Sequence, residues 1–282
     1  MKSIILMLII LKNTFTEYDK LIYGGANMSI VDTFDCCGKE IIRASDFIEK
    51  TDNFPKTMIV VFSAKFCSLF LSKHNATEIG RLTAGGQKHP IYQFEYKGIQ
   101  LGFYNSIIGG AGASGALEEL IALGAEKFLY FGSCGALDKD IAEGNLLVPV
   151  AAYRDEGVSY HYAKPSDYLE IESASRLAKV FEEIGVPYTT TKTWTTDAFY
   201  RETEHNLTLR KQEGCGVVEM ECASIMSVGQ FRQKEVYQFL YAADCLDGSS
   251  WDKRMLGKMP ADLRERILVV AIEAAFRLHN DK

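Results

Sequence analysis

The sequence has little of what marks membrane-spanning, nucleic-acid-binding or metal-binding proteins. Its apolar run near the N-terminus, Ser3 to Leu11, is too short to cross a bilayer. No basic run stands out and the formal net charge is −6, so we expect neither a membrane nor a nucleic-acid partner. The five histidines are scattered, and no two cysteines have C-x-x-C spacing, so we expect no metal.

The cysteines also lack the pattern of a disulfide framework. There are seven, an odd number, without the regular spacings of a disulfide-rich secreted protein. We interpret them as reduced, mostly buried thiols, which predicts a cytoplasmic protein.

The first 27 residues do not fit the rest of the chain. The run from Ser3 to Leu11 resembles the core of a signal peptide, but no small-x-small cleavage site follows it. Gly24-Gly25-Ala26-Asn27 precede Met28, and two glycine codons can spell a ribosome-binding sequence just upstream of a start codon. We therefore expect residues 1–27 to be a mis-called extension or a leader, and residues 28–282 to form one domain.

Short β-branched runs alternate with amphipathic segments after Thr57, and 47% of the residues are hydrophobic. This predicts an α/β fold, a single domain with a mixed central β-sheet flanked by helices. In such sheets ligands collect at the carboxyl ends of the strands. We predict strands over Met58–Phe62, Pro90–Tyr96, Ile99–Tyr104, Lys127–Phe131, Asn145–Ala152, Val186–Thr196 and Val236–Ala243. We predict helices over Ala116–Leu123, Ser173–Gly185, Val218–Phe231 and Pro260–His279.

A glycine-rich loop, Ile107 to Gly115, precedes the first of these helices. Its small residues, Gly109 and Gly110 among them, expose backbone N–H groups at the positive end of the helix dipole, where an anion binds well. A tight strand-to-helix turn without a ligand is the alternative. The segment lacks the Gly-Lys-Ser/Thr of a Walker loop.

A second small-residue segment, Gly132-Ser-Cys-Gly135, follows a predicted strand. Ser133 can donate a hydrogen bond to the same anion. Cys134 invites interpretation as a nucleophile, but no histidine lies in a supporting motif.

Two carboxylates flank a methionine at Glu219-Met220-Glu221. Acidic residues in a first helical turn are commonly only dipole partners. Here the apolar neighbours on both sides predict burial, and a buried carboxylate needs partners. A cis-diol of a sugar is suitable, because one carboxylate can accept both of its hydrogen bonds.

Three further residues are candidates to protonate a planar base or to stack on it. Asp244 follows a predicted strand and can protonate a leaving base, although a turn residue is the plainer interpretation. Phe199 and Tyr200 follow another strand and can stack on a base, with ordinary core packing as the alternative.

Together these segments resemble the nucleoside phosphorylase superfamily, which contains hexameric purine nucleoside phosphorylases, uridine phosphorylases and methylthioadenosine/adenosylhomocysteine nucleosidases. The resemblance runs from about Met58 to the C-terminus. Its most specific part is Val218-Glu-Met-Glu221, with Gly132-Ser-Cys-Gly135 upstream and Asp244 downstream. It implies that residues 28–282 are the catalytic domain.

The resemblance also implies roles. Met220 and Glu221 match the ribose-binding pair, with Glu219 beside them, and Asp244 matches the acid that protonates N7 of a purine. Phe199 matches the aromatic residue that packs on the base, with Tyr200 next to it. The remaining positions match phosphate ligands (Gly109, Gly110, Ser133) or a segment near the active site of uridine phosphorylases (Arg154, Glu156, His161).

The sequence departs from this family at its anion site. Phosphorylases usually have an arginine where Tyr130 stands, and the Gly-Asp-Pro and arginine after the first strand are replaced by Ser63-Ala-Lys-Phe-Cys67. Lys65 and Arg154 are candidates to compensate. The uracil-reading residues of uridine phosphorylases are also replaced, by Thr203 and His205, whereas Asp244 favours purines.

We therefore predict a nucleoside phosphorylase that cleaves a purine nucleoside with phosphate, needs no cofactor and forms a dimer or hexamer. One alternative is a hydrolytic nucleosidase of the same fold, in which Glu219 or Glu156 activates water. Others are a uridine phosphorylase and a non-catalytic nucleoside-binding protein. Retention of Glu221 and Asp244 argues against the last.

Overall fold

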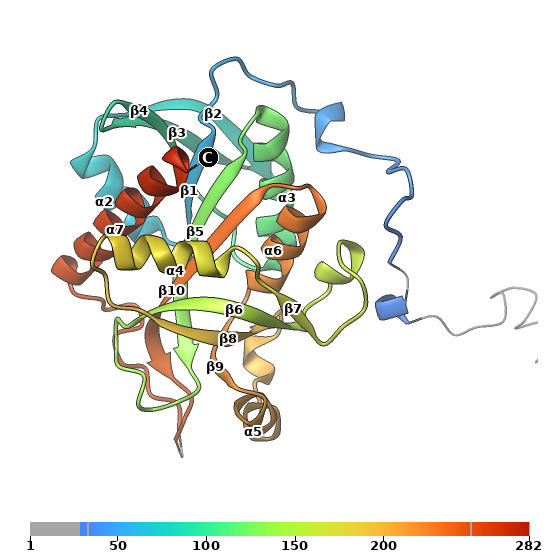
Figure 1. The fold of residues 1–282 in the computed structure, drawn as a ribbon, viewed down its shortest axis with the longest axis vertical. Helices are drawn as coiled ribbons and strands as arrows, with labels where there is room; N and C mark the ends of the chain where they lie inside the picture. The colour runs from blue at the N-terminus through green and yellow to red at the C-terminus, as the bar shows by residue number, and fades with distance from the viewer. Residues whose placement is uncertain (1–28, 33, 249, 282) are drawn as a thin grey trace, which may run out of the picture.

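Strands and helices alternate along the chain in the computed structural model, which describes residues 29–32, 34–248 and 250–281 (Figure 1). The predicted start at Met28 and the segment before it lie outside the described residues. The strands are β1 (Thr57–Val61), β2 (Ala76–Ala84), β3 (Gln87–Tyr96), β4 (Ile99–Asn105), β5 (Lys127–Ala136), β6 (Leu146–Asp155), β7 (Tyr168–Glu170), β8 (Thr189–Thr196), β9 (Cys215–Glu219) and β10 (Glu235–Cys245). The α-helices are α2 (Ala64–Lys73), α3 (Gly110–Leu123), α4 (Ala174–Glu183), α5 (Glu204–Gln212), α6 (Cys222–Phe231) and α7 (Ala261–Asn280).

The strands form one mixed sheet that closes on itself at one end. Their order is β10-β6-β8-β9-β5-β1-β4-β3-β2, with β7 on the edge of β6. Because β10 also pairs with β5 in parallel, the five strands β10, β6, β8, β9 and β5 form a closed ring. The open part, β1 to β4, extends from β5. The α/β fold with a mixed central sheet, predicted from the sequence, is confirmed.

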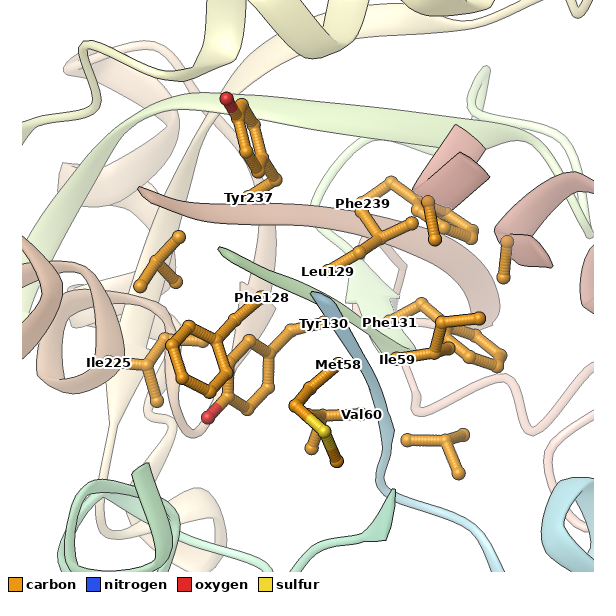
Figure 2. Close-up of a cluster of buried hydrophobic side chains, with 14 of the residues drawn as sticks. Met58, Ile59, Val60, Phe128, Leu129, Tyr130, Phe131, Ile225, Tyr237 and Phe239 are labelled. Atoms are coloured by element: carbon orange, nitrogen blue, oxygen red, sulfur yellow. The ribbon is translucent and has the colours of Figure 1, made fainter. Parts of the chain in front are cut away.

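Helices cover both faces of this sheet. Figure 1 shows α3 and α6 side by side on one face, while α2, α4 and α7 lie on the other. Figure 2 shows how alternate residues of β5 divide between these two layers: Tyr130 points toward Ile225 of α6, whereas Phe131 points toward Phe239. The Phe131 and Phe239 rings stack with centroids 5.3 Å apart. Because successive side chains of a strand point to opposite faces of the sheet, β5 contributes hydrophobic side chains to the packing on both faces.

The two glycines that the sequence predicts at a tight turn and at a helix end, Gly98 and Gly185, both have positive φ. The tight turn predicted at Lys97-Gly98 joins β3 to β4, and both residues have positive φ, 50° and 81°. This backbone suits the twist of a two-residue hairpin. The helix predicted to end at Gly185 ends two residues earlier at Glu183, and Gly185 has a φ of 69°.

Three predicted boundaries near the candidate residues were wrong. The helix after the glycine-rich loop begins at Gly110, six residues earlier than predicted. Strand β5 does not stop at Phe131 but continues to Ala136, so Ser133 lies within a strand. Val218 and Glu219 belong to β9 rather than to a helix, because β9 pairs with both β8 and β5. A short apolar run fits a strand or a helix equally, and the pairing partners decide.

Candidate active site at the carboxyl ends of the strands

The glycine-rich loop and the Glu219-Met220-Glu221 segment meet directly. Glu221 is the residue that precedes α6, and its Oε1 accepts a 2.7 Å hydrogen bond from the backbone N–H of Gly109, the residue that precedes α3. The contact is close because Gly110 has no side chain: a Cβ there would lie 2.2 Å from Oγ of Ser224. Two helix N-termini therefore converge on one buried carboxylate.

Glu219 has a different environment from Glu221. Its Oε1 accepts hydrogen bonds from the hydroxyls of Thr195 (2.6 Å) and Thr193 (3.3 Å). Its Oε2 accepts from the backbone N–H groups of Glu221 (2.8 Å) and Cys222 (2.7 Å). These four donors favour the ionised form of Glu219 and so oppose the effect of its burial.

Glu219 also affects the ionisation of its neighbour Glu221. Burial, and next the carboxylate of Glu219, raise the pKa of Glu221 to about 8. Burial also raises the pKa of Glu219, but its hydrogen bonds oppose that rise. We therefore expect the proton of this pair to reside on Glu221 near neutral pH. Donors that arrive with a ligand would favour ionisation of Glu221.

Glu156 lies against the same helix start, but its oxygens are occupied. Ser224 donates a 2.5 Å hydrogen bond to its Oε2, and the Ser159 hydroxyl donates to its Oε1. The backbone N–H of Val158 adds a 2.8 Å hydrogen bond. Glu156 thus ties the loop after β6 to α6. His161, two residues beyond Ser159 in the 3-10 helix η3 (Ser159–His161), has an exposed side chain.

Arg154 does not fit the phosphate role predicted for it. It is 2% exposed, and its Nε donates to Ser159 at 2.7 Å. Its two terminal nitrogens donate to the carbonyls of Lys164 (2.7 Å), Ser166 (3.3 Å) and Ala163 (3.4 Å). Four of its five N–H groups therefore bind the loop around it, and the buried guanidinium acts mainly to hold that loop in place.

An opening of about 270 Å³ lies where β1, β5 and β10 end, on the face covered by α2 and α7. Ser63 and Lys65 line it from the start of α2, Ser133 from β5 and Arg264 from the first turn of α7. Lys65 donates to the carbonyl of Gly257 at 2.7 Å, and Arg264 donates to that of Met259 at 2.9 Å. The opening thus combines two cations with two hydroxyls.

Tyr130 is not part of this opening. Its ring is 1% exposed and stacks on Phe62 with centroids 5.8 Å apart. Burial raises its pKa, so the phenol stays neutral. An aromatic stack stands where phosphorylases usually have an arginine.

Asp244 lies on β10, and Phe199 and Tyr200 lie on the 3-10 helix η4 (Phe199–Arg201), which follows β8. Asp244 pairs with Gly135 of β5 through a bulge in β10, and its Oδ2 accepts a 2.7 Å hydrogen bond from the indole N–H of Trp251. Burial raises the pKa of Asp244, and the Trp251 hydrogen bond opposes that rise. The Phe199 and Tyr200 rings are 3.9 Å apart and 46% and 89% exposed, so they are available for stacking rather than packed in the core.

Cys134 lies between these carboxylates and is inert. It is 3% exposed, and burial, followed by the charges of Glu219 and Asp244, raises the pKa of its thiol well above the ordinary value. A thiol held protonated is a poor nucleophile.

Sequence reasoning missed four residues that the structure brings to these places. Ser224 is a serine in an apolar helix, and only its contact with Glu156 reveals its position. Glu202, Trp251 and Arg264 lie on loops or helix ends with no recognisable motif, so one sequence gave no signal for them. Among the described residues, no group of three His, Cys, Asp or Glu side chains could hold a metal ion. No helix in the described part of the chain is long and apolar enough to cross a membrane.

Comparison with known proteins identifies the family of this chain. The family model of the phosphorylase superfamily matches residues 56–270, and the chain belongs to that family. It is 36% identical to a uridine phosphorylase of Thermococcus kodakarensis over 108 residues, which are 38% of this chain and 39% of that protein. It is 26% identical to a purine nucleoside phosphorylase of Plasmodium falciparum over 204 residues, 69% of this chain and 81% of that one.

A solved structure agrees on the fold. The purine nucleoside phosphorylase of Toxoplasma gondii, in complex with immucillin-H, superposes with a TM-score of 0.66 at 20% identity. The superposition covers 86% of this chain and 98% of that one. The family resemblance inferred from the sequence is confirmed by the family model, and this superposition agrees on the fold.

Proposed function

We propose that this chain is a nucleoside phosphorylase, a pentosyltransferase that converts a purine nucleoside and phosphate into the free base and ribose 1-phosphate. One observation carries the proposal. The buried carboxyl group of Glu221 and that of Asp244 have raised pKa values, and they lie on or just after β9 and β10, the two strands that pair with Gly135. Paired carboxyl groups with perturbed pKa values are typical of active sites.

The proposed roles follow from the bond that breaks. Cleavage of the C1′–N bond builds positive charge on the ribose and negative charge on the base. We assign the ribose hydroxyls to Glu221, whose position is fixed by Gly109 before substrate arrives. Phosphate oxygen attacks C1′, the bonding electron pair goes to the base, and Asp244 supplies a proton to N7. Phe199, with Tyr200 beside it, stacks on the base.

We assign the phosphate to the opening lined by Ser133, Lys65 and Arg264. Arg264 takes the place that the sequence suggested for Arg154, whose donors bind the protein itself. The N–H of Gly109 was also a predicted phosphate ligand, but Glu221 accepts its hydrogen bond. Gly109 and Gly110 therefore act in this proposal by positioning the ribose-binding carboxylate.

The aromatic stack at Tyr130 favours a second function, hydrolysis by the same fold, because a phosphorylase would use a cation there. A hydrolase needs a carboxylate to activate water, and the candidates were Glu219 and Glu156. Both oxygens of each already accept hydrogen bonds from the protein. This occupancy supports phosphorolysis over hydrolysis.

The test is cleavage of inosine, adenosine and uridine with and without phosphate, with the sugar product identified. We expect ribose 1-phosphate from the purine nucleosides, formed only when phosphate is present. Free ribose at a phosphate-independent rate would assign the hydrolytic function instead. Binding without turnover of any of the three would refute both functions.

We also expect a homo-oligomer, a dimer or hexamer. The segment before β1 has three apolar side chains close together in sequence, Ile41, Ile42 and Phe47, which are exposed by 98%, 70% and 78%. Grouped exposed apolar side chains are typical of an interface, which supports burial against another subunit. Light scattering coupled to size-exclusion chromatography tests this, and a monomeric mass would contradict it.

A further inference from the structure

Two of the cysteines are exposed, and they are neighbours in the sequence. Cys36 and Cys37 lie in the segment before β1, which Figure 1 shows running along the outside of the molecule. Their Sγ atoms are 2.9 Å apart, and one thiol donates a hydrogen bond to the other. The remaining cysteines are buried or, at Cys67, partly buried. A thiol reagent in solution therefore meets Cys36 and Cys37 first, and it meets them as a pair.

A tight turn holds this pair. Oδ1 of Asp35 accepts hydrogen bonds from the backbone N–H groups of Cys37 (3.0 Å) and Gly38 (2.8 Å). Gly38 permits the turn because it has no side chain: a Cβ there would lie 2.0 Å from Oδ2 of Asp35. The two thiols are thus kept together on one exposed bend of the chain.

The bend is attached to the fold a few residues further on. Nη1 of Arg232, the residue that follows α6, donates a 2.7 Å hydrogen bond to Glu40. Nε of Arg232 donates to both oxygens of Glu118 on α3, at 2.8 and 2.9 Å. Neither cysteine is among the residues that line the opening assigned to phosphate, so an inference about them does not rest on the proposed function.

Neighbouring cysteines form an unusual kind of disulfide. Their Cα atoms are about 3.8 Å apart across a trans peptide, whereas the Cα atoms of most disulfides are about 4.4 Å apart or more. A bond between neighbours is therefore strained. Strained or exposed disulfides are the easily reduced ones, and in the cytoplasm disulfides are usually transient or redox-sensing. The pair is thus suited to reversible oxidation rather than to a permanent cross-link.

We propose that Cys36 and Cys37 are a redox modification site that reacts with a small disulfide of the glutathione type and closes to an intramolecular disulfide. The Cys36 thiolate attacks one sulfur of the reagent, whose S–S bond breaks and releases one small thiolate. Cys37 then loses its proton, attacks Sγ of Cys36 and expels the second small thiolate. The two protein protons end on the released thiolates, so the reagent is reduced to two thiols as the pair is oxidised.

The geometry favours closure over a lasting adduct. The contact with Cys36 raises the pKa of Cys37, so Cys37 is the donor in the pair and the sulfur of Cys36 is open to the reagent. Once Cys36 carries the small thiol, the attacking sulfur of Cys37 is already next to it. An intramolecular attack at such short range has a far higher effective concentration than attack by a thiol in solution.

The experiment exposes the native full-length protein to oxidised glutathione, stops the exchange with acid, and blocks the free thiols with N-ethylmaleimide in denaturant. The tryptic peptide that ends at Lys39 contains Cys36 and Cys37 and no other cysteine. Its mass should be that of an unblocked peptide lacking two hydrogen atoms, without glutathione. Brief treatment with dithiothreitol before blocking should restore both N-ethylmaleimide adducts.

Three variants serve as matched controls. In Cys36→Ser and in Cys37→Ser the remaining thiol has no partner beside it, so each peptide should retain one glutathione. Cys67→Ser removes the next most accessible thiol and should close as the wild type does.

Other results for the wild type would overturn the inference. These are a peptide that carries both N-ethylmaleimide adducts after oxidation, a peptide that retains glutathione, and a disulfide that joins two chains on a non-reducing gel. All three are read from the wild-type protein, so none depends on the folding of a variant.

Discussion

The backbone N–H of Gly109 donates a 2.7 Å hydrogen bond to Oε1 of Glu221, and this joins the start of α3 to the start of α6. The bond crosses from the open part of the sheet to the closed ring of strands. The hydrogen bond holds the carboxyl group of Glu221 in place, and burial keeps that group away from water. Such a group is prepared to bind the hydroxyls of a sugar without reorganisation.

Replacing Glu221 by Gln should reduce kcat/KM for inosine by about 10²-fold or more, because an uncharged amide cannot stabilise positive charge on the ribose. Steady-state kinetics with saturating phosphate would check this. Glu204→Gln, at an exposed position, is the matched control. Retention of full activity in Glu221→Gln would exclude Glu221 as the ribose ligand.

The same substitution should change stability in a pH-dependent way. The fold raises the pKa of Glu221 from its ordinary 4.5 to about 8 and so favours the protonated form. Its contribution to stability is present below about pH 4.5 and is lost as pH rises toward 8. We expect Glu221→Gln to melt above the wild type at pH 8 and alongside it at low pH. Melting curves that differ equally at all pH values would contradict this assignment.

Asp244→Asn should lower kcat for purine nucleosides by about 10²- to 10⁴-fold, the range for loss of a general acid. The amide keeps the hydrogen bond from Trp251, so the fold should be retained. Asp262→Asn, an exposed position on α7, serves as the control. A nucleoside with a better leaving group should recover much of the lost rate, and equal losses for good and poor leaving groups would rule out proton donation by Asp244.

Arg264→Ala should raise KM for phosphate by about tenfold and leave KM for the nucleoside nearly unchanged, as expected for loss of one charge-assisted hydrogen bond. Arg266→Ala is a close control, because Arg266 is two residues along α7 and its side chain is 70% exposed in a pair with Asp262. An unchanged phosphate KM in Arg264→Ala would place the anion elsewhere.

Gly110→Ala should destabilise the protein by about 1–3 kcal/mol, because its Cβ would lie 2.2 Å from Oγ of Ser224. Gly115→Ala on the same helix meets nothing within 4 Å and should stabilise by about 0.5–1 kcal/mol. Denaturant melts of both variants provide the comparison. Adding Ser224→Gly to Gly110→Ala should recover part of the loss, and absence of any recovery would show that the clash lies elsewhere.

Part of this fold could be predicted from local sequence patterns. The β-branched run at β1 and the Lys97-Gly98 turn predicted their elements because strand formation and turn geometry depend on neighbouring residues. The order of Val218-Glu-Met-Glu221 and Asp244 sufficed for the family. None of these features needs knowledge of a distant contact.

Tertiary structure decided the rest, because the remaining features depend on residues far apart in the chain. Glu219 ends a strand rather than starting a helix because β8 and β5 offer it pairing partners. Arg154 is buried because a loop supplies carbonyls that accept its hydrogen bonds, whereas Arg264 lines the opening because α7 packs beside α2. The pKa values of Glu202 and Glu221 likewise arise from burial and from neighbouring charges, which only the folded chain brings together.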